Sequence, residues 1–336
     1  MTGIEDVAVA TGVSTATVSR ALRGLAGVSA GTRARVLTAA QELGYVPSSA
    51  ASGLASGRTM AMGVLLPQIE RWYFSAVLEG VDRQLRAAGY DLIVFSLGGT
   101  GMNRERVFHR SILRKRIDAL LVMCMELTEA EHRSLRELES PTIVVGGSVQ
   151  GVRHVGIDDA GAVSDAVEHL ISLGHTKIGH VRGGGDDGLS FEVPRIREEA
   201  YLAAMAAHNL PIRDEWSVFG DFRFSEAKVA VKRMLATVRE RPTALFCSSD
   251  EMAFGALVAA AELGISVPAE LSIVGIDDHE FAEPMGVTTV RQKPEEQGAF
   301  AAELLLSELE GAVPVLKPPT QPHELIQRTS TGPAPR

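Results

Sequence analysis

Apolar residues follow a helical spacing at the start of the chain and a strand–helix alternation beyond it. Within about the first 45 residues they recur at intervals of three and four, the spacing of one helical face. This pattern predicts three short helices: one from about Ile4, one over Thr15–Leu22 capped by Ser14, and one opened by Ser29. The predicted packing face of the third helix consists of Val36, Leu37, Ala40 and Leu43.

Beyond Arg58, short apolar runs alternate with amphipathic helical segments. The runs predict strands at 62–66, 91–95, 119–122, 142–145, 155–157, 178–181, 244–247 and 271–276. Strands separated by helices form parallel sheets with helices on both faces. Two such series predict a doubly wound, two-lobed α/β unit. Because ligands in open α/β sheets bind at the carboxyl ends of the strands, a binding cleft is expected between the lobes.

The first two helices are joined at Gly12, and two short helices linked by a glycine turn match a helix-turn-helix, whose second helix enters the DNA major groove. On that second helix, Ala16 and Arg20 fall opposite the apolar stripe, with Thr17 and Ser19 on its flanks and Thr15 at its exposed end. The guanidinium of Arg20 can donate two hydrogen bonds to guanine, whereas hydroxyls suit phosphate oxygens. The spacing alone also fits a helical cap without a role in DNA binding.

The residues of this head resemble the DNA-binding head of the lac repressor family (LacI–GalR). The resemblance is carried by Asp6-Val7-Ala8, Gly12-Val13-Ser14, Ala16-Thr17-Val18-Ser19-Arg20-Ala21-Leu22, Val28-Ser29, Thr32-Arg33 and Leu43-Gly44-Tyr45-Val46-Pro47. It implies that Thr15, Ala16 and Arg20 contact base edges, whereas the chemistry of Ser14, Thr17 and Ser19 suits phosphate contacts. Arg23 stands where the family usually has asparagine, and we expect it to add a phosphate or base contact.

The segment after the head is rich in small residues, a composition typical of a flexible linker. The resemblance instead implies a hinge that folds into a short helix on DNA and inserts Leu54 into the minor groove, where an apolar wedge bends the duplex. A plain linker remains the alternative. The expected division is a head over about 1–45, a hinge over 46–59 and an effector-binding and dimerisation domain over 60–332. Its N-lobe takes about 60–161 and 294–323, and its C-lobe about 162–293 and 324–332.

The resemblance extends to a periplasmic-binding-protein-like core and thus to nearly the whole chain. It is carried by Asp158-Asp159-Ala160-Gly161-Ala162, Ser249-Asp250-Glu251-Met252-Ala253-Phe254-Gly255-Ala256, Val274-Gly275-Ile276-Asp277-Asp278 and Leu325-Ile326-Gln327-Arg328-Thr329-Ser330-Thr331. In this family it implies that Arg197 binds the effector, that Asp277 accepts paired ligand hydroxyls and that Phe222 stacks on a ligand ring. These three types of side chain suit a polyhydroxylated ring, such as a sugar or sugar derivative.

Three further ligand-binding residues are expected where the chain departs from the family. Ser249 replaces a usual asparagine, and Trp72 and Tyr73 belong to a segment where relatives often read Asn-Pro-Phe-Phe. We expect Trp72 and Tyr73 to line the cleft from the N-lobe. Two structural alternatives stay open: Arg197 and Asp277 form an ion pair with each other, and Phe222 belongs to the core.

The net charge of −9 argues at first against a nucleic-acid partner. The first 58 residues, however, carry five basic and three acidic side chains, a balance of +2, whereas the remainder carries 28 basic and 39 acidic, a balance of −11. DNA attraction is therefore expected to be local and to depend on positioned contacts rather than on overall charge. A homodimer is the simplest state, because one head covers only half of a pseudo-palindromic operator.

Other classes of function lack their motifs. No long apolar segment or secretory signal is visible, and Cys124 and Cys247 lie in apolar runs that suit reduced thiols. The glycine-rich stretch 183–188 lacks the residues of a phosphate-binding loop, and neither metal-ligand spacing nor a nucleophile motif is present. We therefore expect no enzyme activity, catalytic residue, metal or cofactor.

The predicted function is a sequence-specific DNA-binding transcriptional regulator, a repressor, controlled allosterically by a small molecule. It is expected in the cytoplasm, associated with the nucleoid. The alternative is a solute-binding receptor without DNA binding, which would need a signal sequence and no head. An enzyme on a Rossmann-like fold comes third.

Overall fold

The computed structural model describes residues 3–22, 24–45, 58–97, 104–105, 107–108, 113, 116–125, 127–138, 140–147, 151–184 and 192–336. Contacts divide the chain into two compact units, Met1–Met60 and Ala61–Arg336. Within the described residues, no helix is both long and apolar enough to cross a membrane.

The first unit contains three helices, α1 (Ile4–Thr11), α2 (Thr15–Leu22) and α3 (Ala30–Glu42). Gly12 ends α1 with a left-handed backbone (φ 68°), which glycine adopts without a steric penalty. The hydroxyls of Ser14 and Ser29 accept hydrogen bonds from the backbone N–H groups of Thr17 and Thr32, both at 3.2 Å. The predicted helices and caps are therefore confirmed. The buried core residues of this unit are Val7, Ala8, Val18, Ala21, Val36 and Ala40.

The predicted packing face of α3 is wrong at two positions. Val36 and Ala40 are buried, but Leu37 and Leu43 are 48% and 38% exposed. A step of one residue turns a side chain by about 100° around the helix, so Leu37 lies away from the stripe defined by Val36 and Ala40. Ala39 and Tyr45 pack against the core in their place.

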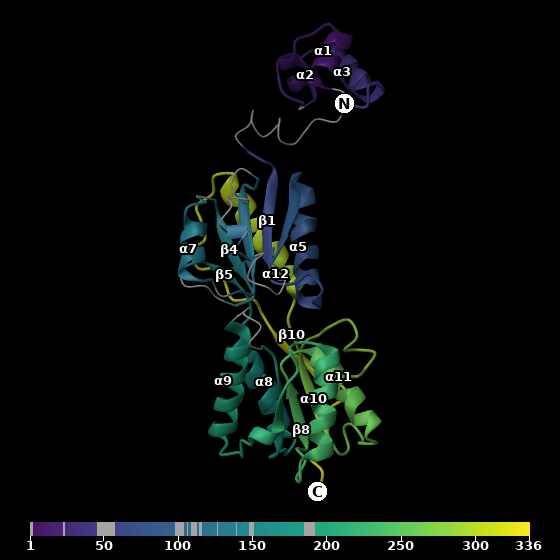
Figure 1. Ribbon diagram of the computed structural model, residues 1–336, viewed down its shortest axis with the longest axis vertical. Helices are drawn as coiled ribbons and strands as arrows, with labels where there is room; N and C mark the ends of the chain where they lie inside the picture. Colours follow the sequence, from purple (N-terminus) through teal and green to yellow (C-terminus); the bar gives the residue numbers. More distant parts are fainter. Residues whose placement is uncertain are drawn as a thin grey trace. The chain divides into compact units, whose positions relative to one another are not determined.

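The second unit begins with a five-stranded parallel sheet that forms the N-lobe (Figure 1). Its strand order is β2-β1-β3-β4-β5, with β1 (Ala61–Leu66), β2 (Asp91–Ser96), β3 (Ala119–Met123), β4 (Thr142–Val145) and β5 (His154–Val155). Every residue of β1 and β3 is buried, as expected for central strands covered on both faces. Helices α5 (Trp72–Ala88) and α12 (Pro294–Leu309) pack against each other, and α7 (Glu129–Arg136) contributes Leu135 to a separate core cluster.

The C-lobe contains a six-stranded sheet of order β11-β10-β9-β8-β6-β7. All neighbouring strands are parallel except the edge pair of β10 and β11. The strands are β6 (Ile178–Arg182), β7 (Ser217–Phe219), β8 (Ala244–Cys247), β9 (Ser272–Asp277), β10 (Thr288–Arg291) and β11 (Glu324–Ile326). The covering helices are α8 (Asp159–Ser172), α9 (Glu192–Ala207), α10 (Phe224–Thr237) and α11 (Asp250–Glu262), and a short 3₁₀ turn, Asp214–Trp216, precedes β7.

Helices cover both faces of this second sheet. Ala244 and Phe246 of β8 pack into the core cluster that includes α8 and α9, whereas Leu245 and Cys247 pack into the cluster that includes α10 and α11. This alternation is the period of two that a strand imposes on its side chains. The doubly wound α/β architecture with an all-α head is therefore confirmed.

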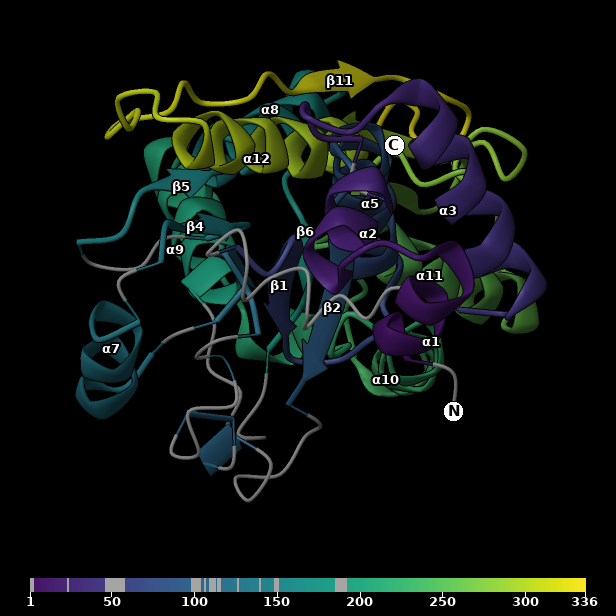
Figure 2. The ribbon, with the colours of Figure 1, turned by 90° about the horizontal axis from the view of Figure 1, so that it is seen from above.

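The chain crosses between the lobes three times: between β5 and α8, between β10 and α12, and between α12 and β11. The last crossing returns the chain to the C-lobe, where β11 lies beside α8 (Figure 2). The first and last crossings are paired, since the backbone N–H of Gln321 donates to the carbonyl of Gly156 at 2.8 Å. The N-lobe is thus completed by α12, which comes late in the sequence.

Three strands of the C-lobe, β7, β10 and β11, were absent from the predicted set. Each has only three or four residues, and β7 and β11 lie at the two edges of the sheet, where their burial is incomplete. Short, partly exposed edge strands such as β7 and β11 carry too few apolar positions to produce a clear alternation. The interior strand β10 reads Thr-Thr-Val-Arg and has only one apolar residue, although it is buried.

Candidate functional site

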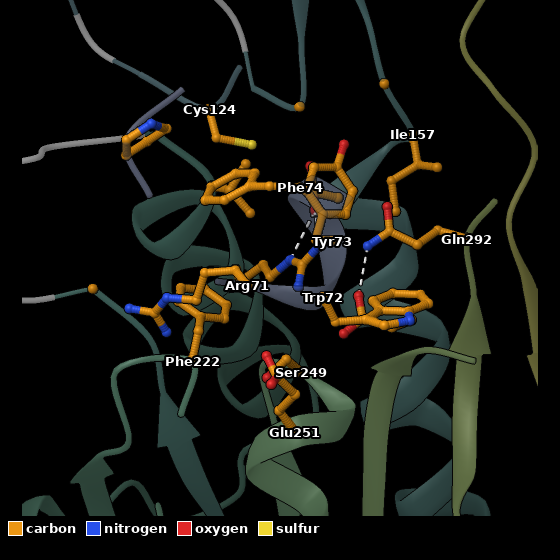
Figure 3. A pocket seen from close by; sticks show the side chains of 18 of the residues that line it. Arg71, Trp72, Tyr73, Phe74, Cys124, Ile157, Phe222, Ser249, Glu251 and Gln292 are labelled. Carbon is orange, nitrogen blue, oxygen red and sulfur yellow. Dashed lines mark hydrogen bonds and ion pairs between the residues drawn. The ribbon is translucent and has the colours of Figure 1, made fainter. Parts of the chain in front are cut away.

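A cavity lies between the two lobes, where the strands of both sheets end (Figure 3). From the N-lobe, Pro67 follows β1, Cys124 follows β3 and Gly146 follows β4. From the C-lobe, residues after β6, β7 and β8 and the last residue of β9 reach the same space. The carboxyl ends of two parallel sheets therefore face one cavity, which is the position expected for a ligand site in open α/β sheets.

All six residues that the sequence predicts as ligand-binding line this cavity. They are Trp72, Tyr73, Arg197, Phe222, Ser249 and Asp277. Residues that the sequence reasoning did not single out lie among them, including Gln68, Arg71, Asp159, Glu251, Gln292 and Gln297. Of these, Asp159 and Glu251 lie inside motifs that carry the family resemblance, so a signal for them was present in the sequence.

A chain of hydrogen bonds connects the N-lobe to Asp277. The hydroxyl of Tyr73 donates to Oε1 of Gln297 at 2.9 Å, and Nε2 of Gln297 donates to Oε1 of Gln292 at 3.2 Å. Nε2 of Gln292 then donates to Oδ1 of Asp277 at 2.6 Å (Figure 3). Every bond donates toward the carboxylate, so each link orients the next amide.

The partner of Arg197 is Asp159 and not Asp277. Nη2 and Nε of Arg197 lie 2.7 and 2.8 Å from Oδ1 of Asp159, and Nη1 donates to the carbonyl of Ser248 at 2.5 Å. The predicted alternative of a direct ion pair between Arg197 and Asp277 is therefore wrong. Burial alone would lower the pKa of Arg197, but the carboxylates of Asp159 and Asp277 outweigh it and raise the pKa.

Burial changes the pKa of Asp277, in the cavity wall, and of its neighbour Asp250. It raises the pKa of Asp277 to about 6, against the opposing effects of nearby Arg197 and of the hydrogen bond from Gln292. Burial also raises the pKa of Asp250, and the charge of Asp277 adds to this rise. Asp250 lies behind the cavity, where its Oδ2 accepts from the backbone N–H of His279 at 2.9 Å. Ionisation of both neighbours together is therefore unfavourable.

Aromatic rings form much of the remaining wall. The ring of Trp72, from the N-lobe, lies 4.7 Å from the ring of His279 in the C-lobe, centroid to centroid. Phe222 lines the cavity and also packs on a core cluster of the C-lobe, so it is part of the core as well as of the cavity wall. Its stacking on a ligand ring stays a prediction. Its ring lies so close to Gly183 that a Cβ there would come within 2.0 Å of it. Gly183 therefore allows the ring to lie flat against the chain after β6.

The lobes are also joined beside the cavity by charged side chains. Arg71, at the start of α5, donates to the carbonyl of Asp221 and lies 3.3 Å from its carboxylate. In a second ion pair the arginine comes from the C-lobe and the carboxylate from the N-lobe: Arg223 lies 2.7 Å from Glu70. The sequence reasoning missed these contacts because their partners are about 150 residues apart and no local pattern joins them.

Four non-glycine residues of the cavity wall have positive φ angles: Cys124 (43°), Asp221 (51°), Phe222 (50°) and Asp277 (142°). Such conformations cost free energy and persist where the surrounding structure holds them. Their gathering at one cavity shows that the fold maintains this wall in a particular shape, as binding sites commonly require.

The head places the predicted DNA-contacting side chains of α2 together. Thr15, Ala16 and Arg20 are exposed, and Thr17 and Ser19 are partly buried beside them. The hydroxyls of Ser14 and Thr17 lie 3.0 Å apart and share a hydrogen bond. The two other predicted contacts, Arg23 and Leu54, lie outside the described residues, as does most of the predicted hinge.

Within the described ranges, no group of three or more histidine, cysteine or acidic side chains is arranged to hold a metal ion. Cys124 and Cys247 are both free and buried, and burial raises the pKa of each thiol well above its usual range. A raised pKa disfavours the thiolate form that nucleophilic chemistry requires.

Comparison with known families assigns both parts of the chain. The family described as bacterial regulatory proteins, lacI family, matches residues 3–48, and the periplasmic binding protein-like domain matches residues 167–331. Two curated relatives carry the description HTH-type transcriptional repressor PurR. The one from Vibrio vulnificus (strain CMCP6) is 33% identical over 315 residues, covering 92% of both chains. The one from Serratia proteamaculans (strain 568) is 35% identical over 315 residues, covering 92% of this chain and 91% of the relative.

The chain therefore belongs to the lacI family of bacterial regulatory proteins. It is a DNA-binding transcriptional regulator, in agreement with the class predicted from the sequence, and neither the enzyme nor the solute-receptor alternative is favoured.

Solved structures extend the similarity to the whole fold. The lac repressor dimer bound to operator and the anti-inducer ONPF matches with a TM-score of 0.85 and 25% identity, covering 98% of this chain and 99% of that one. The complex of the transcriptional regulator CelR with cellobiose matches with a TM-score of 0.70 and 27% identity, covering 98% and 100%.

Proposed function

We propose that the chain is a repressor that binds a pseudo-palindromic operator as a homodimer, and that a sugar or sugar derivative in the interlobe cavity controls this binding. The supporting observation is the convergence of Trp72, Arg197, Phe222 and Asp277 on one cavity. Asp277 offers a carboxylate oxygen to ligand hydroxyls, and the aromatic rings offer apolar surface to a ring face. A structural neighbour holds cellobiose, which favours this ligand class.

The DNA contacts are assigned by their place on α2. Thr15, Ala16 and Arg20 project from its exposed side, and we assign them to base edges in the major groove. Ser14, Thr17 and Ser19 lie beside them and are assigned to phosphates. Arg23 and Leu54 keep the roles expected from the sequence, a backbone or base contact and a minor-groove wedge. Operator binding of this kind would place the protein at the nucleoid.

The three crossings between the lobes are part of the coupling between the effector cavity and the DNA-binding head. A ligand that contacts both walls of the cavity has different interactions with open and closed lobes, and it therefore shifts the equilibrium between them. In a dimer, that shift would alter the separation of the two heads and their fit to operator half-sites. The domain limits expected from the sequence, with the hinge over 46–59, are part of this proposal.

Two substitutions on opposite units test the proposal. Arg20→Ala should abolish specific operator binding in a gel-shift titration while leaving effector affinity, measured by calorimetry, unchanged. Asp277→Ala should remove effector binding while leaving operator binding by the free protein intact. A thermal-shift screen of sugars and purines with the wild-type protein identifies the effector for these measurements, and adding it to the gel shift shows whether it releases or tightens the complex.

Unchanged sequence preference in Arg20→Ala would contradict the assignment of α2 to base reading. Effector binding retained in Asp277→Ala would show that the ligand lies elsewhere. Sedimentation of the free protein tests the homodimer, which a monomer at working concentrations would contradict.

A further inference from the structure

The charged side chains around the interlobe cavity do not balance. Counting those that line it and the two that extend the network at its edge, there are three arginines, Arg71, Arg197 and Arg223, and five carboxylates, Asp159, Asp221, Glu251, Asp277 and Glu70. The distribution of bonds among them shows which charges remain available to a ligand.

Each arginine is already held by a carboxylate of the protein. Arg197 pairs with Asp159 at 2.7 Å, Arg71 with Asp221 at 3.3 Å and Arg223 with Glu70 at 2.7 Å. Arg71 and Arg223 are further held by Oε1 of Gln68, at 3.1 and 3.3 Å. An anionic ligand would have to compete with these carboxylates for every guanidinium.

Two carboxylates are left without a cation of their own. Asp277 accepts from the side chain of Gln292 and, at 3.4 Å, from the backbone N–H of Asp250, both of which are uncharged donors. Glu251 makes no hydrogen bond or ion pair with any residue in the described ranges. It stands in the first turn of α11, on the C-lobe side of the cavity, together with Ser249 (Figure 3).

The pKa of Glu251 reflects this excess of carboxylates over arginines. Burial raises the pKa of Glu251 to about 7, and the charge of Asp277 adds to this rise. Arg71 and Arg223 are near enough to oppose the shift but do not cancel it. A carboxylate whose pKa rises in this way lacks a compensating positive charge. A ligand cation placed beside it would supply that charge.

The walls around these two carboxylates are aromatic. Trp72, Tyr73 and Phe74 line the cavity from the start of α5, and Phe222 lines it from the C-lobe. The faces of aromatic rings attract organic cations, and such rings together with carboxylates form the usual environment of a bound ammonium group.

We propose that the effector carries a protonated nitrogen, as in an amino sugar, and that Glu251 and Asp277 bind it within the aromatic walls. This inference rests on the proposed function, since it names the class of ligand for the same cavity. It distinguishes this chain's ligand from a neutral sugar and from a phosphate ester.

Fluorescence quenching measures the charge around Trp72 without any effector, and its change on Glu251→Gln isolates the contribution of the cavity. Trp72 lines the cavity, whereas the other tryptophan, Trp216, is only 1% exposed. The variant Trp72→Phe gives the background fluorescence of Trp216. Relative to their quenching of free N-acetyltryptophanamide, caesium ions should quench Trp72 more strongly than iodide ions. Glu251→Gln should reduce the caesium effect and increase the iodide effect. Glu303→Gln removes the same charge from an exposed position of α12 and should change neither.

Binding of matched compounds tests the ligand class itself. The probes are glucose, glucosamine, N-acetylglucosamine and glucose 6-phosphate, with the galactose series beside them, titrated calorimetrically into the full-length dimer. In at least one series the amine should bind about tenfold or more tightly than its neutral counterparts, and Glu251→Gln should remove most of that difference. Glu303→Gln should retain it.

The proposal requires both results. Stronger quenching by iodide, an amine that binds no more tightly than the neutral sugar, no measurable binding of either amine, or tightest binding of the phosphate ester would each overturn it. Operator binding by the free protein is measured separately in a gel shift. A failed preference for amines with intact operator binding would therefore refute the ligand class and leave the repressor assignment standing.

Discussion

Replacing Gly298 by alanine tests how closely the two N-lobe helices must pack to build the cavity. Gly298 lies on α12 next to Gln297, and a Cβ at this position would lie 2.2 Å from the carbonyl oxygen of Val77 on α5. The reciprocal contact occurs at Gly80 of α5, where a Cβ would lie 2.0 Å from the carbonyl oxygen of Glu295. The two backbones thus touch through a pair of glycines.

Two opposing effects determine the result of Gly298→Ala. Alanine in a helix interior is more favourable than glycine by about 1 kcal/mol. A Cβ needs more than 3 Å from a carbonyl oxygen, so the helices would have to separate by about 1 Å, a gap that forfeits a quarter to a half of each van der Waals contact across it. Overpacking of this kind costs about 1–3 kcal/mol, and loss of the hydrogen bond between Tyr73 and Gln297 adds about 1 kcal/mol. The clash outweighs the helical preference, and we expect a net loss of about 2 kcal/mol.

For a unit of this size, that loss corresponds to a fall in Tm of roughly 5 °C, measurable by differential scanning calorimetry. Effector affinity should fall with it, because Gln297 orients Gln292 and through it Asp277. Gly31→Ala is the matched control, since Gly31 is helical and a Cβ there would meet nothing within 4 Å. A Gly298→Ala protein as stable as wild type, or stabilised as the control is expected to be, would refute the reasoning.

Three further substitutions address charges. Glu251→Gln should stabilise the protein by about 1.5 kcal/mol at pH 8 but hardly at pH 4, with partial solvent screening allowed for. The folded-state pKa is raised to about 7, so the contribution of this carboxyl group to stability is complete at low pH and is lost as the pH rises through 7. Glutamine cannot ionise and therefore avoids this loss at pH 8. Equal stabilisation at both pH values in urea titrations would contradict this. The side chains of Glu308 and Arg153 form an ion pair and are only 7% and 8% exposed. Glu308→Ala should cost about 3–5 kcal/mol of unfolding free energy by leaving Arg153 buried without its partner. Replacing both residues by methionine should restore most of that stability. A single substitution that costs under about 1 kcal/mol in urea would show the pair to be dispensable. Arg71→Ala should weaken calorimetric effector binding about fivefold by removing an interlobe ion pair with Asp221 worth about 1 kcal/mol, and unchanged affinity would exclude a role for that contact in closure.

Most of the fold follows from local sequence patterns, and the exceptions have local causes. The eight predicted strands all correspond to observed strands within one or two residues, because most of them are buried apolar runs. The exceptions are β2 and β5, which lie at the edges of the N-lobe sheet and are only partly buried. The missed strands β7, β10 and β11 are short, and β11 pairs antiparallel at an edge. Leu37 shows the opposite failure, since apolar character alone does not decide on which side of a helix a residue lies. Leu43 is exposed because it is the C-cap residue beyond the last turn of α3.

The sequence predicts the cavity residues that follow directly on strands, but it does not predict which side chains pair with one another around the cavity. Asp277 ends β9, and Ser249 follows β8, so their place at a ligand site follows from the topology. That Arg197 pairs with Asp159 rather than with Asp277 depends on side-chain geometry within the assembled lobe. No local pattern states which of two carboxylates, both near one arginine, accepts its hydrogen bonds.

The hydrogen bonds that connect Tyr73 to Asp277 suggest a route by which ligand binding can be transmitted between the lobes. Asp277 is buried and receives a line of donors that begins at Tyr73 on α5 and passes through Gln297 on α12 and Gln292 at the crossing after β10. A ligand group that takes the place of the Gln292 amide at Oδ1 of Asp277 displaces that amide, which then changes its partner or moves. Since Gln297 holds Gln292 and also Tyr73, that adjustment reaches α5 and α12, whose backbones touch at Gly80 and Gly298 and leave little room for either helix to move alone. The N-lobe therefore responds as one body, and a change at one carboxylate of the C-lobe can alter how the whole N-lobe is held.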